Sequence, residues 1–205
     1  MKYEWKKNEK KLYLAKNKPE LITVPKFKFF TIEGKGNPNN SFFAEYIAVL
    51  YSLSYAVRMS PKQEIAPKDY FEYTVYPLEA VWEGTEPVDG KIDKNKFVFN
   101  LMIRQPDFVT DAFAKKIIEI TKKKKPHELL DKVLFESIED GESIQMLHIG
   151  TYDSETESFK QMEQFVDQIK KKRTTHTHRE IYLSDPRKVV PEKLKTVLRF
   201  QVKNM

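Results

Sequence analysis

The spacing of apolar residues divides this chain into short strands and a few helices. Runs of β-branched and aromatic residues bounded by Gly or Pro predict strands at 27–33, 73–82, 96–104, 143–150, 179–183 and 195–203. Apolar residues at helical spacing predict helices over 42–58, 109–121, 128–139 and 155–172. Asp153 or Ser154 is expected to cap the helix that begins near Glu155.

The order of these elements repeats along the chain. Strand, helix and two strands are followed by connecting helices, and then strand, helix and two strands return. The order predicts an α+β fold of duplicated β-α-β-β units with antiparallel sheets and a ligand cleft between the halves. We expect an N-terminal arm or short helix over 1–20 and a single domain over 21–205. Its pseudo-repeats are about 21–106 and 141–205, joined by helices within 107–140.

A weak sequence agreement accompanies this repeat of architecture. The segment Pro77–Val81 aligns with His178–Tyr182, and Glu79 and Glu180 then occupy the same place in each half. Two such halves would carry matching glutamates on matching strands.

Composition narrows the class of protein. Of the 205 residues, 40% are hydrophobic and 32% charged, which is typical of a globular chain. The absence of cysteine excludes disulfides, thiolate nucleophiles and zinc–thiolate sites. The charged N-terminus and the lack of a long apolar run predict a cytoplasmic protein without a membrane partner.

The net charge of +6 raises the alternative of nucleic-acid binding. The excess is spread thinly, and its two short clusters, Lys122–Lys125 and Lys170–Arg173, fall where helices are expected to end. Cations at a helix C-terminus complement the helix dipole. We therefore expect no direct DNA binding, with a phosphate or nucleic-acid role as the alternative.

Most of the candidate chemistry lies in the predicted strand near residue 180. Side chains alternate along a strand, so His178, Glu180 and Tyr182 share one face. A buried carboxylate next to a phenol can act as a base or position a water, and the phenol can donate a hydrogen bond. The alternative is an ordinary solvent-exposed strand face.

Further ligand-binding candidates are aromatic, acidic or imidazole side chains elsewhere in the chain. They are Trp82, Glu83, Tyr46, Tyr55, His148 and His178. Trp82 is equally compatible with a core position, and alternation places Trp82 and Glu83 on opposite faces of their strand. His176 and His178 resemble a metal pair, but no third ligand is spaced to join them, so we expect no metal.

Three segments together resemble the GyrI-like small-molecule-binding family, in its stand-alone branch. They are Lys28–Pro38, Pro77–Glu83 and His178–Leu198, and the resemblance spans most of residues 20–203. It implies an SHS2-type arrangement of duplicated β-α-β-β units with a ligand cleft between them. Glu180 and Tyr182 match the family's Glu-x-Tyr motif.

The resemblance also implies a function. Family members serve as effector-binding domains of multidrug-responsive regulators that receive lipophilic cations, but this chain has no helix-turn-helix segment. The stand-alone branch resembles cyclopropanoid cyclopropyl hydrolases, which detoxify DNA-alkylating natural products of the yatakemycin type. The resemblance then implies that Glu180 directs a water and that Trp82 stacks on the substrate. Tyr182 would donate a hydrogen bond or orient the reacting groups.

This reading requires no cofactor and predicts a flat, lipophilic or aromatic small molecule as the partner. The alternative is a non-catalytic binder or sensor of lipophilic or cationic drugs. The oligomeric state is left open.

Overall fold

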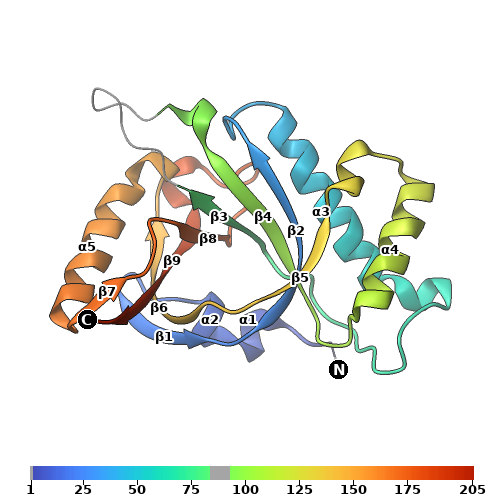
Figure 1. Ribbon diagram of the computed structural model, residues 1–205, viewed down its shortest axis with the longest axis horizontal. Coiled ribbons are helices and arrows are strands. Elements are labelled where there is room, and N and C mark those ends of the chain that lie inside the picture. The colour runs from blue at the N-terminus through green and yellow to red at the C-terminus, as the bar shows by residue number, and fades with distance from the viewer. Residues whose placement is uncertain (1, 84–92) are drawn as a thin grey trace. The chain divides into compact units, whose positions relative to one another are not determined.

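The computed structural model describes residues 2–83 and 93–205, which fold into two compact units (Figure 1). Among the described residues, the first unit combines 2–4, 27–78 and 93–138, and the second combines 5–26, 79–83 and 139–205. Both contain antiparallel strands and helices, which confirms the predicted α+β class. The extent of the two predicted pseudo-repeats stays a prediction.

The first unit has a central strand with one partner on each side. Strand β2 (Phe27–Lys35) pairs antiparallel with β4 (Val98–Gln105) and with β5 (Leu134–Ile138). Helix α3 (Phe42–Arg58) packs against β2 and β4, and α4 (Asp111–Lys124) packs against α3. The boundaries of α3 are those that the apolar spacing predicts. A short 3₁₀ turn at Ser60–Gln63 follows α3, and another at Lys94–Lys96 precedes β4.

The predicted helix over 128–139 is wrong. A 3₁₀ turn at Glu128–Asp131 is followed by strand β5 along β2. Phe135 packs on Phe30 with ring centroids 5.3 Å apart, and the Thr31 hydroxyl donates to Glu136 at 2.6 Å. These cross-strand contacts exist only once β2 is in place, so the local sequence could not reveal them.

The second unit is a five-strand antiparallel array with one further strand at its end. Its order is β1 (Glu20–Val24), β6 (Gly141–Ile149), β9 (Lys195–Asn204), β8 (His178–Tyr182) and β3 (Leu78–Glu83), and β7 (Lys171–Arg173) pairs with the far end of β9. The predicted strand over 73–82 is thus shorter. Helices α1 (Trp5–Asn8) and α2 (Lys10–Tyr13) precede β1, and 3₁₀ turns lie at Tyr152–Ser154 and Pro191–Lys193.

Helix α5 (Glu155–Gln168) covers one face of this array. Its buried stripe meets alternate residues of β6 and β9 in an apolar core made of Ile144, Met146, Met162, Val166, Leu198, Phe200 and Val202. The register explains the match, because Ile144 lies opposite Phe200 and Met146 opposite Leu198. The side chains of β6 and β9 that alternate in step with these residues therefore point to the face on which α5 lies.

The Lys170–Arg173 cluster does not end a helix as predicted. The helix ends at Gln168, Lys170 adopts a φ of 55°, and Lys171–Arg173 forms β7. The Arg173 guanidinium lies over the Phe200 ring, 4.4 Å from its centroid. This cationic run is thus partly a packing element rather than a solvated helix end.

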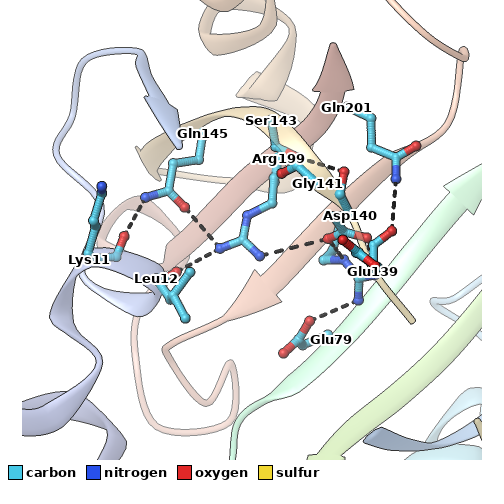
Figure 2. Close-up of polar contacts among 11 residues, drawn as sticks. Lys11, Leu12, Glu79, Glu139, Asp140, Gly141, Ser143, Gln145, Arg199 and Gln201 are labelled. Atoms are coloured by element: carbon cyan, nitrogen blue, oxygen red, sulfur yellow. Dashed lines mark hydrogen bonds and ion pairs between the residues drawn. The ribbon is translucent and has the colours of Figure 1, made fainter. Parts of the chain in front are cut away.

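The opposite face of β8 and β9 carries a buried ionic network (Figure 2). Arg179 and Arg199 lie directly across from each other, an arrangement that like charges make unfavourable. Asp140 compensates by accepting from Arg179 at 2.8 Å, and Glu79 accepts from Arg179 at 3.0 Å. Arg199 lies 3.9 Å from Asp140. The two arginines and two carboxylates balance in charge.

The same network anchors the N-terminal segment of the second unit. Arg199 donates to the Leu12 carbonyl at 2.7 Å and to Gln145 at 2.9 Å. Gln145 donates in turn to the Lys11 carbonyl at 2.7 Å (Figure 2). It also donates to Glu20 at 2.8 Å. Residues 5–20 of the expected N-terminal arm therefore belong to this unit, whereas residues 2–4 belong to the first. The network fixes the face of β8 that carries Arg179. The neighbouring side chains of β8 must therefore point to the opposite face.

Candidate functional site

The α5-covered face of β8 and β3 brings several predicted site residues together. Register places Trp82 opposite His178 and Ala80 opposite Glu180. The indole Nε1 of Trp82 donates to the Tyr182 hydroxyl at 3.0 Å. Glu83 is exposed and has the other parity, so the structure does not bring it to this cluster.

Glu180 is the acceptor at the centre of the cluster. The Tyr182 hydroxyl donates to its Oε2 at 2.7 Å, and His178 Nε2 lies 3.0 Å from its Oε1. An ionised carboxylate can only accept, so the Nε2 of His178 carries the proton. Glu180 is only 7% exposed. Its position is therefore fixed by one donor on each oxygen.

Glu155 is a further member of the cluster that sequence reasoning missed. It is the first residue of α5, and its side chain hydrogen-bonds to Glu180. An acidic residue in the first turn of a helix normally complements the helix dipole from solvent. The sequence pattern around Glu155 therefore did not indicate a site residue. Here Glu155 is 6% exposed. Two carboxyls in contact require a proton between them.

The electrostatics assign that proton to Glu155. Burial is the largest cause, and the nearby Glu180 charge adds to it, so the pKa of Glu155 rises far above its ordinary value. Burial and the Glu180 charge likewise raise the pKa of Tyr182 well above 10 and that of Tyr152 to about 12. At neutral pH Glu155 is therefore protonated and the phenols of Tyr152 and Tyr182 are neutral.

Aromatic rings surround the carboxyl pair. The Tyr152 ring meets the Tyr182 ring edge-on at 6.0 Å, and the Phe159 ring meets the His178 imidazole at 4.7 Å. Trp82 closes a further side and is buried. Tyr152 is 42% exposed, so the cluster reaches solvent on that side. Tyr152 and Phe159 flank Glu155 in sequence, and the sequence offered no sign of their partners on β8.

The other predicted ligand-binding residues lie elsewhere. His148 is buried on β6 and hydrogen-bonds to Ser158 and Thr151 rather than to Glu180. Tyr46 and Tyr55 belong to the first unit. Tyr46 packs edge-on against Phe99 at 5.5 Å, and Tyr55 is 47% exposed.

A metal ion has one candidate place among the described residues. Single ligand atoms of Glu155, His178 and Glu180 lie within 4.8 Å of one another. The hydrogen bonds among these side chains already account for their convergence, because a proton shared by two carboxyls fulfils the role that a cation would take. A metal would have to displace that proton.

Comparison with known proteins places the chain in a family. Residues 17–203 match the family described as the GyrI-like small molecule binding domain, and the chain belongs to this family. No curated protein matches it.

Solved structures agree with this membership. A hydrolase of Listeria innocua is 36% identical, with a TM-score of 0.91 over 99% of this chain and 100% of its own. An uncharacterized conserved protein of Listeria innocua is 37% identical, with a TM-score of 0.90 over 98% and 100%. The C-terminal domain of EcmrR is 15% identical and, with a TM-score of 0.53 over 92% and 98%, shares the fold.

Across residues 2–83 and 93–205, no helix combines the length and the apolar character that crossing a bilayer requires.

Proposed function

We propose that this protein is a cofactor-independent hydrolase that adds water to the activated cyclopropane of flat, aromatic, DNA-alkylating compounds. The observation that carries the proposal is the contact between the buried carboxyls of Glu155 and Glu180, beside Trp82 and Tyr152. The similarity to a Listeria innocua hydrolase over nearly the whole chain supports an enzymatic role.

In the proposed reaction the carboxyl pair acts on the water. Glu180 accepts one proton of the water while the water oxygen bonds to the unsubstituted cyclopropane carbon. The strained carbon–carbon bond breaks, and its electron pair passes through the conjugated ring to the carbonyl oxygen, which becomes a phenolate. The phenolate then takes a proton from solvent, and Glu180 returns the proton of the water to solvent. Glu155 keeps its own proton and hydrogen-bonds through it to Glu180, which orients the base.

The geometry restricts what the pair can do. In an in-line opening the leaving oxygen lies far from the attacking water, whereas Glu155 and Glu180 touch each other. Both carboxyls therefore act on the attacking water, and neither donates a proton to the phenolate. The Tyr182 hydroxyl already donates to Glu180. This contact favours a role for Tyr182 in orienting the base over a role as a hydrogen-bond donor to the substrate.

The experiment is incubation of the purified protein with a cyclopropane-bearing alkylator in ¹⁸O-labelled water. Mass spectrometry is expected to find the hydrolysed product with one ¹⁸O, formed over many turnovers and equally in the presence of a chelator. A chelator-sensitive rate would contradict the cofactor-independent mechanism. Saturable binding with unchanged alkylator would leave only the alternative, a non-catalytic binder.

The aromatic wall allows a prediction on affinity. Trp82→Phe is expected to weaken binding of a flat aromatic ligand about tenfold, because it removes ring area and the N–H that fixes the Tyr182 hydroxyl. Isothermal titration calorimetry measures the change. Trp5→Phe, at the other tryptophan, is the matched control and should leave the affinity unchanged. Equal weakening in both variants would contradict a stacking role for Trp82.

A further inference from the structure

His148 forms hydrogen bonds on both sides of its ring, and both partners lie close to Glu155 in sequence. Its Nε2 lies 3.0 Å from the Thr151 carbonyl, and its Nδ1 lies 2.9 Å from the Ser158 hydroxyl. A carbonyl only accepts, so Nε2 carries the proton and Nδ1 accepts from Ser158. The imidazole is 5% exposed and fully engaged. It therefore has no free atom for a ligand.

These two bonds bracket the start of α5. Thr151 lies in the turn before the helix, and Ser158 lies one turn beyond Glu155. Ser154 is the N-cap residue, yet its hydroxyl makes no capping bond and donates instead to the Thr151 carbonyl at 2.7 Å. The first turn of α5 thus lacks the usual side-chain cap. The bonds to His148 attach this turn to β6 in its place.

Gly150 provides an independent sign that this arrangement is specific. Its φ is +145°, a conformation that other residues rarely adopt. A Cβ at this position would lie 2.9 Å from the Ser154 hydroxyl and 3.3 Å from His148 Nε2. Only glycine lets the turn approach the imidazole this closely.

The position of Glu155 depends on how the start of α5 is held against the strands. Glu180 is fixed by β8, whereas Glu155 comes from a helix end that must be held against the same face. We infer that His148 is a positioning residue that, through Thr151 and Ser158, holds Glu155 in contact with Glu180. This inference rests on the proposed function for its catalytic meaning, but the contact itself can be measured without a substrate.

The test follows the protonation of Glu155 directly. ¹³C NMR of glutamate carboxyl carbons, assigned with Glu155→Gln, reports the pH at which Glu155 ionises. In His148→Leu the start of α5 loses both hydrogen bonds, so Glu155 moves away from Glu180. The midpoint pH of Glu155 ionisation is then expected to fall by about one pH unit or more. Asp153, Tyr152 and Tyr182 also face Glu155 and are unchanged in the variant.

Turnover gives the second readout. His148→Leu is expected to lower kcat about 10- to 100-fold with little change in KM, because the aromatic wall is intact. His148→Gln places an amide N–H near the position of Nε2, keeps the bond to Thr151, and should recover part of both effects. If His148→Leu does not fold, Ser158→Ala removes one bond only and carries the same test.

A pair of glycine variants supplies the matched control. Gly150→Ala is expected to reproduce the fall in the Glu155 midpoint. Gly141 also has a positive φ, +61°, but open space around the added Cβ, so Gly141→Ala should not. A folded His148→Leu with a wild-type midpoint would overturn the positioning role. A shifted midpoint with no turnover even in the wild type would refute the proposed hydrolase and leave the positioning role standing.

Discussion

Glu180→Gln is expected to lower turnover of a cyclopropane alkylator by about 10³-fold while leaving its binding nearly unchanged. Glutamine has the size of glutamate but cannot take a proton from water. Its amide oxygen can still accept from His178, and the Tyr182 hydroxyl can rotate to accept from the amide nitrogen. Rapid-quench kinetics and calorimetry on the same preparation separate the loss of chemistry from any loss of affinity.

The control for this substitution lies on the same unit. Glu163 of α5 is exposed and pairs with Arg173 at 3.4 Å, so Glu163→Gln changes the same functional group away from the cluster. It should turn over at the wild-type rate. Full activity of Glu180→Gln would exclude Glu180 as the base and would also remove the central argument for the hydrolase.

Comparison with Glu155→Gln separates the roles of the two carboxyls. The glutamine amide can donate to Glu180 as the protonated Glu155 does, so the base keeps its orientation. Glu155→Gln should therefore cost much less turnover than Glu180→Gln. The reverse order would assign the base to Glu155.

Elements with strong internal periodicity were predictable from the sequence. The boundaries of α3 follow from the spacing of its apolar residues, and the shared face of His178, Glu180 and Tyr182 follows from strand alternation. The strand β1 was missed and β5 was predicted as a helix. Both are short edge strands whose stability comes from a partner distant in sequence, β6 and β2 respectively.

The candidate site was predictable only on its β8 and β3 side. The sequence indicates Glu180 and Tyr182 because they are neighbours on one strand. Glu155 comes from the end of a helix, and no local pattern reveals that this end packs against β8. The alignment of Glu79 with Glu180 also suggested a matching role, whereas the register turns Glu79 to the opposite face, where it binds Arg179.

The buried Glu155 also makes a prediction about stability. Its pKa is raised in the folded protein from an ordinary value of 4.5, so the folded state holds a proton that the unfolded state has lost. The contribution of Glu155 to stability is therefore fully present below about pH 4.5 and declines as the pH rises toward the folded pKa. The free energy of unfolding should fall by up to about 1.4 kcal/mol per pH unit in that window.

Glu155→Gln removes this dependence because glutamine stays neutral at every pH. The variant should match the wild type in stability near pH 4.5 and exceed it at pH 8 by about 2 kcal/mol or more. Urea denaturation at a series of pH values measures the difference, and Glu163→Gln, which alters an exposed carboxyl, should show no comparable trend. A difference between Glu155→Gln and wild type that is constant with pH would mean that Glu155 is ionised in the fold. In that case the proton between the two carboxyls would belong to Glu180, and Glu180 could not act as the base. The gain at pH 8 instead would show that the folded protein gives up stability to keep a protonated acid beside its base, which is expected of a site selected for chemistry rather than for packing.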